Sequence, residues 1–373
     1  MSLLFWSCAI VLGFSYVGYL AALAFAGLMA GKGRSAAARE FSSWPGVSAV
    51  LTVFNEERII ASKIENFFSC KYRGPREMVI VSDGSTDRTV EIIRRFEGEQ
   101  MRLIAHPGRR GKDLALADAV RESHGEILIF TDAGAMFAED ALEELVRPFM
   151  DPDVCLVSGV ASYAGAESAN LYRRYEDWLK SLEAKLGVLS GALGPMYAIR
   201  RASCRPKDLQ LFNDFADAIL VALDGNTATL ATAAVCRQNR SEDGHWARQV
   251  RNVSCAAAVL FHYLPRLLTK RRWKAALVLV THKLLRWLTL PLLILMAVAA
   301  WTLRDAGGVY RTALILGAAF PTAAAVGLLA EKAGLGRRLR VAYDFFVTIT
   351  AWSVGLGRCL TGRVPVVWQP RGL

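Results

Sequence analysis

The seven cysteines of this chain form no recognisable ligand pattern. They are spread over 373 residues, with no Cys-x-x-Cys pair and no spacing typical of a zinc site. This excludes a disulfide-rich secreted domain and a structural zinc module. We expect free thiols in a reducing compartment.

The sequence also lacks internal repeats, and its low-complexity sequence is limited to a short Gly/Ala/Ser linker at residues 31–39. The formal net charge is +11 at pH 7, yet no stretch combines basic with aromatic residues as nucleic-acid-binding faces do. We therefore expect no nucleic-acid partner. Part of the positive charge has a simpler use, which is attraction to the anionic headgroups of a lipid bilayer.

Long apolar runs are what the chain does have. Hydrophobic residues make up 53% of it, and residues 3–29 are almost free of charge. This run is longer than a bilayer needs, and a cleaved signal peptide is the weaker interpretation because no basic residues precede it. We predict an N-terminal transmembrane helix within residues 1–31.

Three more apolar runs, each about long enough to cross a bilayer, lie at residues 288–303, 312–330 and 341–356. We expect the last run not to cross fully, because Asp344 lies within it and Gly355 interrupts its end. Residues 287–373 are thus predicted to be a C-terminal transmembrane region and tail. Residues 256–286 alternate Lys and Arg with large apolar residues, which predicts amphipathic helices in the headgroup plane.

Strands alternate with helices through the central region. Its apolar stretches of strand length are residues 47–53, 78–81, 103–105, 127–130, 154–160 and 228–235. Stretches of helical spacing separate them, at residues 57–70, 87–96, 113–123, 171–186 and 212–223. This order predicts an α/β domain over residues 45–255, with a mostly parallel sheet and helices on both faces. Basic clusters beside the apolar runs place this domain in the cytoplasm and the N-terminus outside.

Asp132 follows the apolar strand 127–130 and precedes three small residues, Ala133, Gly134 and Ala135. In an open α/β sheet, ligands bind at the carboxyl ends of the strands. A carboxylate there, with little bulk after it, could hold a divalent cation and admit a diphosphate. The alternative is an ordinary turn in which the Asp accepts backbone hydrogen bonds.

Other polar residues have similar pairs of interpretations. Asp83, at the end of the second strand, could contact a nucleotide base or ribose, or close an Asx-turn. Lys112, in the flexible loop GRRGK, could meet a phosphate or only water. Asp214 and Asp217 lie in the first turn of a predicted helix, where they could supply a general base or only favourable helix-end charge.

Arg248 and Arg251 lie three residues apart and share one helical face. They could contact a diphosphate or the lipid surface, or form a solvated face.

At this point the chain resembles the membrane-bound family 2 glycosyltransferases of the polysaccharide-synthase type, which include hyaluronan and cellulose synthases and bacterial exopolysaccharide glycosyltransferases. The resemblance spans about residues 45–285, and its strength lies in the order of several short motifs. The matching motifs are Phe54-Asn55-Glu56-Glu57, Asp83-Gly84-Ser85-Thr86-Asp87, Gly111-Lys112, Thr131-Asp132-Ala133, Gly194–Arg201, Asn213-Asp214-Phe215 and Arg248-Gln249-Val250-Arg251.

The resemblance implies a GT-A fold that binds a nucleoside diphosphate sugar, usually a UDP-sugar, with Mg²⁺ or Mn²⁺. Asp214 would be the catalytic base and Asp132 the metal ligand. The implied nucleotide-binding residues are Asn55, Glu56, Asp83, Lys112, Asp132, Arg248 and Arg251. The implied acceptor-binding residues are Glu183, Gly194, Pro195 and Tyr197.

The chain departs from the family pattern at two positions. The metal motif usually has two acids one residue apart, but position 134 is Gly, so metal binding would depend on Asp132 and substrate oxygens. The Gln-x-x-Arg-Trp motif of the processive synthases keeps only its arginine here, as Arg251-Asn252. The missing Trp supports the acceptor sugar in those enzymes.

These features predict an inverting, multi-pass glycosyltransferase of the bacterial inner membrane. It would move a sugar to a glycan or lipid-linked acceptor in exopolysaccharide or cell-surface glycan synthesis. One alternative is non-processive transfer of a single sugar to polyprenyl phosphate or a lipid-linked oligosaccharide. Another is an inactive membrane subunit that binds nucleotide or polysaccharide, which the single acid of the metal motif favours.

Overall fold

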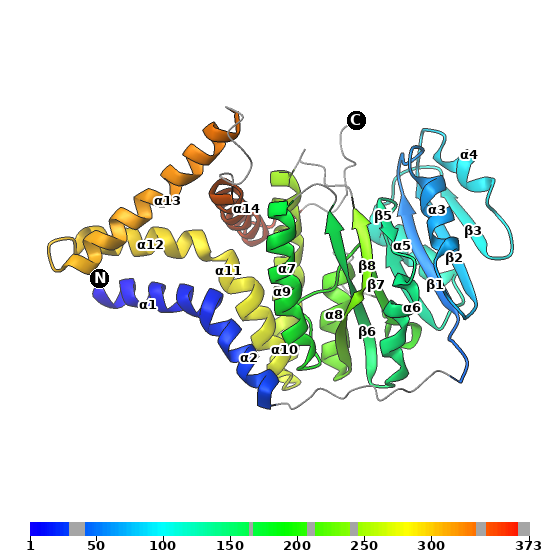
Figure 1. Ribbon diagram of the computed structural model, residues 1–373, viewed down its shortest axis with the longest axis horizontal. Coiled ribbons are helices and arrows are strands. Elements are labelled where there is room, and N and C mark those ends of the chain that lie inside the picture. The colour runs from blue at the N-terminus through cyan, green and yellow to red at the C-terminus, as the bar shows by residue number, and fades with distance from the viewer. Residues whose placement is uncertain (30–41, 164–166, 207–212, 239–244, 333–340, 365–373) are drawn as a thin grey trace. The chain divides into compact units, whose positions relative to one another are not determined.

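The computed structural model describes residues 1–29, 42–163, 167–206, 213–238, 245–332 and 341–364. The predicted linker 31–39 and the last nine residues lie outside these ranges. The chain divides into two compact units (Figure 1). The membrane unit comprises residues 1–25, 242–260 and 277–364, and the sheet unit comprises residues 26–241, 261–276 and 365–373.

The sheet unit contains one eight-stranded sheet, in the order β3-β2-β1-β4-β7-β6-β8-β5. Its first four strands in that order are parallel, β7 runs antiparallel between β4 and β6, and β5 is an antiparallel edge strand on β8. The strands are β1 (Val47–Val53), β2 (Arg76–Asp83), β3 (Met101–His106), β4 (Ile127–Thr131), β5 (Ala135–Phe137), β6 (Val154–Tyr163), β7 (Met196–Arg200) and β8 (Thr227–Gln238).

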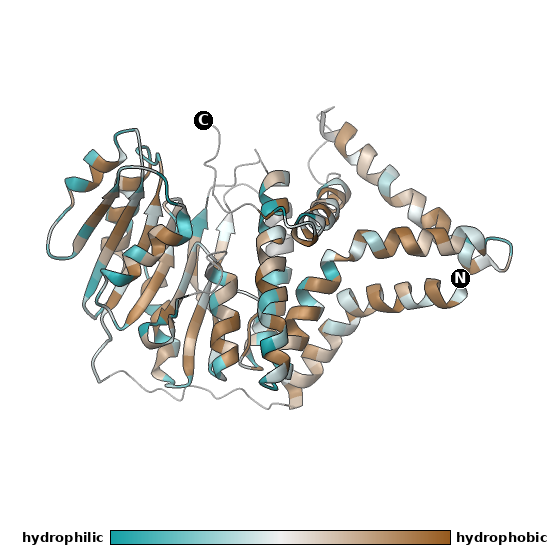
Figure 2. Ribbon diagram, turned by 180° about the vertical axis from the view of Figure 1, so that it is seen from behind, coloured by the Kyte–Doolittle hydropathy of each residue, from teal (hydrophilic) through white to brown (hydrophobic). Residues whose placement is uncertain are grey.

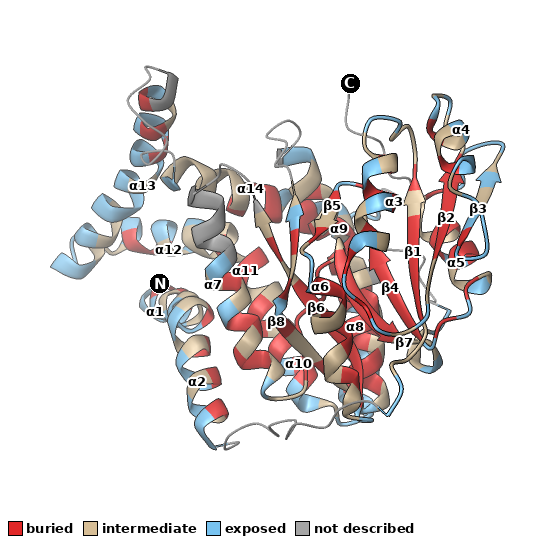
Figure 3. Cartoon of the chain, turned by 45° about the vertical axis from the view of Figure 1, so that its right-hand side comes forward, coloured by how far each residue is buried: buried red, intermediate tan, exposed pale blue. Residues whose placement is uncertain are grey.

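Hydrophobic residues on both faces of the central strands bury the sheet between two layers of helices. Alternate residues of β1 point to opposite faces. Leu51 lies in the core cluster with Phe67 of α3, whereas Val50 lies in the second cluster with Leu116 of α5. Figure 3 shows the central strands as buried along most of their length. The helices of this unit are α3 (Ile60–Ser69), α4 (Thr89–Arg94), α5 (Lys112–Arg121), α6 (Ala141–Val146), α7 (Glu167–Ala184) and α8 (Asn213–Asp224).

The predicted α/β sheet with helices on both faces is confirmed, and the bounds of β1 agree with the prediction. Parallel pairing joins β1 to β4, is interrupted by the antiparallel β7, and returns between β6 and β8. Three short elements were not predicted, namely β5, α6 and β7. Strand β5 has only three residues, which are too few to show a periodic pattern.

The membrane unit is built from apolar helices, among them α1 (Ser2–Gly13), α12 (Thr289–Thr302), α13 (Gly308–Lys332) and α14 (Val341–Leu360). Figure 2 shows hydrophobic residues along much of α1, α12 and α13. Among the described residues, two helical stretches are long and apolar enough to cross a membrane, Ser2–Met29 and Gly308–Ala330. Helix α14 is not one of them, and its partial crossing stays a prediction.

The stretch predicted to lie in the headgroup plane contains the end of α9 (His245–Thr269), α10 (Trp273–Leu279), a π-helical turn and α11 (Leu285–Trp287). Trp273–Trp287 and Thr289–Thr302 together pass the same test but are bent by 60° at their junction. By length and composition, the pair suits one broken span or a re-entrant loop. The interfacial placement of residues 256–286 stays a prediction.

Candidate active site

The loops that follow β1 and β2 are tied to each other by hydrogen bonds. Asn55, in a left-handed conformation with φ 54°, accepts a bond from the Thr86 amide through its side-chain oxygen at 2.8 Å. The amide of Glu56 donates to the hydroxyl of Thr89 at 2.8 Å. Asn tolerates positive φ better than most residues, so it suits this turn. Asn55 thus fixes the shape of the strand-end loops, which is a role distinct from the predicted nucleotide contact.

Asp83, at the end of β2, holds the basic loop that precedes α5. Its buried carboxylate accepts hydrogen bonds from the amide of Arg110 at 2.6 Å and from the amide of Gly111 at 3.0 Å. Gly84 has φ +75°, and a Cβ there would lie 2.7 Å from the carbonyl carbon of Gly108. Only glycine allows the loop to pass this close. Asp83 therefore positions the loop, whatever else it contacts.

The arginines of this loop are held by neighbouring side chains. Arg109 lies over the ring of Phe54, with 4.2 Å between the guanidinium carbon and the ring centroid. Arg110 pairs at 2.7 Å with Asp118, a buried acid that also receives Arg121 at 2.7 Å. These contacts hold the loop before Lys112 against Phe54 and against α5.

Lys112 and Asp132, both predicted to meet the donor, form an ion pair. The Lys112 ammonium lies 2.6 Å from Oδ1 of Asp132, and the two side chains are 39% and 37% exposed. Lys112 is the first residue of α5, and Asp132 directly follows β4. Both groups remain accessible to a ligand at the carboxyl end of the parallel strands, where α/β proteins bind their ligands.

Asp214 belongs to the same electrostatic cluster. Burial raises the pKa of its carboxyl to about 6, against the opposing effect of the Lys112 and Lys180 ammonium groups. Burial lowers the pKa of Lys112, but Asp132 and then Asp214 more than offset it, so the pKa is raised. An acid with a pKa near 6 is ionised at neutral pH and basic enough to accept a proton from a hydroxyl.

Gly194 leaves room for the Asp214 carboxylate. A Cβ at position 194 would lie 2.9 Å from Oδ2 of Asp214. The other carboxylate oxygen accepts the amide of Phe215 at 3.0 Å, which fixes the side chain at the start of α8. The half-buried turn at Gly194 and Pro195 thus lies directly beside the predicted base.

Asp217 and Tyr197 lie in the core instead. The Tyr197 hydroxyl donates to Oδ2 of Asp217 at 2.8 Å, and both residues are only 1% exposed. The Tyr197 ring stacks on Phe130 of β4, with ring centroids 4.7 Å apart. The structure therefore separates the two acids that the sequence left as alternatives. Asp217 has a packing partner, and Asp214 faces the Lys112 cluster.

Glu183, predicted to bind the acceptor, is fully buried and accepts the amide of Ser190 at 2.9 Å. It supports the turn that leads from α7 to Gly194. Lys180 and Glu176 lie one and two turns before it on α7 and are also buried. A helix face that carries charged residues at positions 176, 180 and 183 was a detectable signal, because that spacing repeats with the helical period. Sequence reasoning missed Lys180.

Lys63 is a second buried lysine that sequence reasoning missed. It is fully buried on α3, its ammonium donates to the carbonyl of Ala135, and it lies 3.9 Å from the ring centroid of Phe137. Burial lowers its pKa to about 8, against the opposing effects of Cys236, Cys70 and Asp132. The signal was a lysine within the apolar helical pattern Ile60, Ile64, Phe67.

A divalent metal ion fits this site through one protein ligand. Among the described residues, no group of three His, Cys, Asp or Glu side chains could hold an ion. Asp132 is half-exposed, however, and a Cβ at the neighbouring Gly134 would meet only Ile59, at 4.0 Å. Magnesium keeps several waters and often takes one or two carboxylates plus substrate phosphate oxygens. Asp132 can supply that single carboxylate.

Arg248 and Arg251 lie in the part of α9 that belongs to the membrane unit, and both are partly buried. Their predicted contact with the diphosphate stays a prediction.

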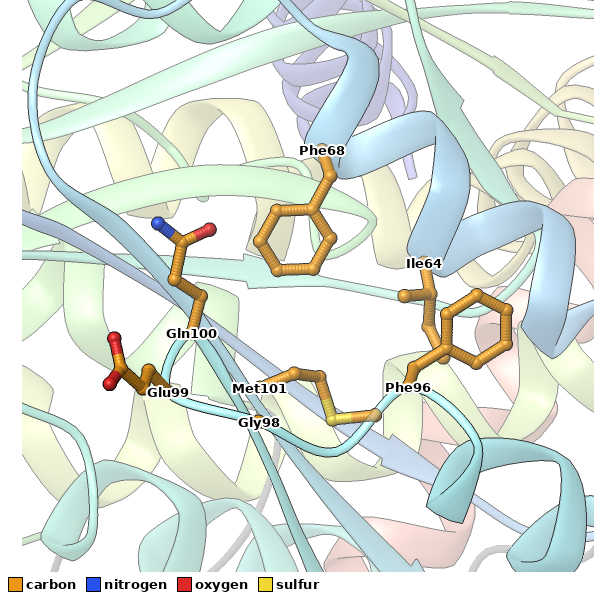
Figure 4. Close-up of a pocket in the computed structure, with 7 residues that line it drawn as sticks. All are labelled: Ile64, Phe68, Phe96, Gly98, Glu99, Gln100 and Met101. Atoms are coloured by element: carbon orange, nitrogen blue, oxygen red, sulfur yellow. The ribbon is translucent and has the colours of Figure 1, made fainter.

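A separate pocket of about 390 Å³ opens on the sheet unit between α3 and the turn before β3 (Figure 4). It is lined by Ile64, Phe68, Phe96, Gly98, Glu99, Gln100 and Met101 and contains none of the predicted site residues.

Comparison with known proteins places the strand-end motifs in a known family. Residues 48–205 match the family described as Glycosyl transferase family 2. An N-acetylglucosaminyltransferase of Rhizobium sp. (strain N33) is 26% identical over 171 residues, which are 43% of this chain and 38% of that protein. The dolichyl-phosphate beta-glucosyltransferase ALG5C of Trichomonas vaginalis is 33% identical over 101 residues, 25% of this chain and 30% of that protein. The matches span less than half of each relative.

A solved structure resembles nearly the whole chain. The mannosyltransferase PcManGT from Pyrobaculum calidifontis, in complex with GDP-Man and Mn²⁺, superposes with a TM-score of 0.71 at 23% identity. The superposition covers 96% of this chain and 99% of that one. It supports the GT-A fold together with the apolar helices. Residues 48–205 therefore match a glycosyltransferase family 2 domain, and the chain has the fold of a solved sugar transferase.

Proposed function

We propose that the chain transfers a sugar from a nucleoside diphosphate sugar to a glycan or lipid-linked acceptor at a membrane. The observation that carries this proposal is the cluster of Asp132, Lys112 and Asp214 at the carboxyl end of the parallel strands. It combines a carboxylate for a metal, a cation for a phosphate and a buried acid with a base-like pKa. The relatives named for sugar transfer support the reaction class.

The donor diphosphate lies, in this proposal, at the N-terminus of α5, beside the Lys112 ammonium. Lys112 leaves its ion pair with Asp132 and contacts a phosphate oxygen, while the helix N-terminus favours negative charge. A divalent ion held by Asp132 and donor oxygens would neutralise part of the charge on the leaving diphosphate. A mannosyltransferase of similar fold was solved in complex with GDP-Man and Mn²⁺, which supports a nucleotide-sugar donor and a divalent ion for this chain.

Asp214 acts as the general base. The acceptor hydroxyl attacks the anomeric carbon on the face opposite the diphosphate, the bond from that carbon to the diphosphate oxygen breaks, and Asp214 takes the hydroxyl proton. The anomeric configuration inverts. The Asp214 carboxylate lies against Gly194, so the acceptor hydroxyl would approach it beside this half-buried turn.

The proposed orientation places the sheet unit in the cytoplasm, and the membrane is the inner membrane of a bacterium. The basic residues that flank the apolar helices support this side, because cytoplasmic loops carry excess Lys and Arg. The two apolar helical stretches, Ser2–Met29 and Gly308–Ala330, support attachment to a bilayer.

A panel of UDP- and GDP-sugars, with the purified full chain in detergent or nanodiscs, tests the proposal. One or a few donors should release nucleoside diphosphate when a polyprenyl phosphate or oligosaccharide acceptor is present. Chelation by EDTA should stop the release, and Mg²⁺ or Mn²⁺ should restore it. No release with any donor and acceptor, from protein that still binds nucleotide, would favour the inactive-subunit alternative.

Transfer of a single sugar is the second candidate. Asn252 stands where the processive synthases carry the Trp that supports the acceptor sugar. With a radiolabelled donor, single transfer gives a product one sugar longer than the acceptor, whereas processive synthesis gives long chains at early times.

A further inference from the structure

The turn that carries Asp132 is followed at once by β5, whose outer edge is covered by no strand of the described residues. Strand β5 pairs with β8 on one side and is the last strand of the sheet. The backbone groups of alternate residues in a strand face the same edge. Ala135 and Phe137 thus share an edge that needs hydrogen-bond partners, since unpaired buried backbone groups are costly.

Helix α3 supplies these partners with side chains. Asn66 donates to the carbonyl of Phe137 at 2.9 Å and accepts its amide at 2.7 Å, so it replaces both bonds of a neighbouring strand. Lys63, one turn earlier on the same helix face, donates to the carbonyl of Ala135. The chain after α3 continues the contact, because the Lys71 amide donates to the carbonyl of Glu139 at 2.8 Å.

Ala135 also closes the turn that presents Asp132. Its amide donates to the carbonyl of Asp132 at 3.1 Å, and its carbonyl is the acceptor for Lys63. Ala135 is therefore hydrogen-bonded through its amide to the predicted metal ligand and through its carbonyl to the buried ammonium. Ile59, directly before α3, packs toward Gly134 in the same turn.

Burying the Lys63 ammonium costs much more desolvation free energy than one hydrogen bond to a carbonyl requires. An uncharged donor would meet the same need without the desolvation cost of a charge. The charge has electrostatic partners in the ring of Phe137 and in the carboxylate of Asp132. The site has one acid where the related motif has two, so a fixed positive charge behind the turn adds to the attraction for a diphosphate.

We propose that Lys63 and Asn66 form a clamp on β5 that positions Asp132 for the metal and donor diphosphate, and that the Lys63 charge contributes to anion binding. Both are positioning residues, since they act through the turn and touch no substrate. This inference rests on the proposed function for its ligand. The clamp itself concerns only the backbone of residues 131–138.

Binding by calorimetry tests the proposal in the purified full chain, with UDP and GDP titrated in the presence of Mn²⁺. Lys63→Met should weaken binding by about tenfold, as is typical when a supporting partner of a metal ligand is lost. Asn66→Ala, which removes no charge, should weaken it by roughly threefold, less than the tenfold at the low end of such effects. Ser69→Ala is the matched control on the same helix, and its binding should equal that of the unmodified protein.

Hydrogen exchange of residues 131–138 supplies a readout that needs no ligand. Exchange should be faster in Lys63→Met and Asn66→Ala and unchanged in Ser69→Ala. If the unmodified protein binds neither nucleotide, the proposed function fails while the exchange still decides the clamp. Unchanged binding and exchange in Lys63→Met would overturn the inference. If Lys63→Met does not fold, nucleotide binding and hydrogen exchange of Asn66→Ala decide the inference. Unchanged binding and exchange in Asn66→Ala would then overturn it.

Discussion

The two halves of the sheet unit organise their polar residues differently. Beside the parallel strands β1 to β4, the polar side chains directly follow a strand and hold the loops through backbone amides, as Asn55 and Asp83 do. Beyond β7, the charged groups lie within helices and are buried, as Lys180 and Asp217 are. The first half holds the loops that bind the donor in the proposed function. The second half surrounds one acid with an environment that raises its pKa.

The largest effect on turnover is expected from a change of Asp214. Asp214→Asn should lower turnover by about 10²- to 10⁴-fold, because the general base is lost. Nucleoside diphosphate binding should stay close to that of the unmodified protein. The measurement is the initial rate of nucleotide release at saturating donor and acceptor.

The thermal stability of Asp214→Asn should change in the opposite direction to its turnover. The pKa of Asp214 is raised in the folded protein. The folded state therefore holds the proton more tightly than the unfolded chain, and stability falls as pH rises toward about 6. Asp214→Asn removes this cost and should raise the thermal midpoint at pH 7.5. A lower midpoint with lost turnover would mean that the variant simply unfolds.

The donor half should respond next most strongly. Lys112→Met removes the cation that pairs with Asp132, and we expect kcat/KM for the donor to fall by about 10- to 100-fold, a loss of roughly 1.4 to 2.7 kcal/mol in transition-state stabilisation. Lys112→Arg keeps the charge and should recover part of this loss. Equal kcat/KM in Lys112→Met and the unmodified protein would show that the lysine only neutralises Asp132.

How far the sequence predicts this molecule also differs between the halves. The strands of the parallel half and the residues Asp83, Lys112 and Asp132 could be recognised, because each follows or precedes a clear apolar run. The Lys112–Asp132 ion pair could not be recognised, since it joins residues that are far apart in sequence. Strand β5 was missed because it has only three residues.

The buried lysines were hidden for a different reason. A lysine within a helix is usually exposed, so Lys63 and Lys180 looked ordinary until their helix faces were known. Tyr197 shows the converse, because it lies in a motif of the acceptor side and yet is buried against Phe130.

The pH dependence of turnover tests the environment of Asp214 while the loops beside β1 to β4 stay unaltered. Turnover should fall below about pH 6 as Asp214 takes up a proton. Lys180→Met removes a positive charge that lowers the pKa of Asp214, so the midpoint should move to higher pH. The kcat profile between pH 5 and 8 measures this. A midpoint that is unchanged or moves down would separate Lys180 from the base.

The smallest effect on activity is expected from Tyr197→Phe. This change removes the hydroxyl that donates to Asp217 and should cost about 1 to 3 kcal/mol of unfolding free energy. Turnover and the acceptor KM should change by less than about threefold, which corresponds to about 0.7 kcal/mol. A large rise in acceptor KM with little loss of stability would instead support the predicted contact of Tyr197 with the acceptor.

The most direct test of the central claim is the binding of UDP or GDP with Mn²⁺ to three forms of the full chain, measured by calorimetry beside turnover. Asp132→Asn should lose most of the binding, whereas Asp214→Asn should bind like the unmodified protein and fail to turn over. That separation is what one site with a donor-binding acid and a catalytic acid requires. Full binding in Asp132→Asn, or full turnover in Asp214→Asn, would contradict the account.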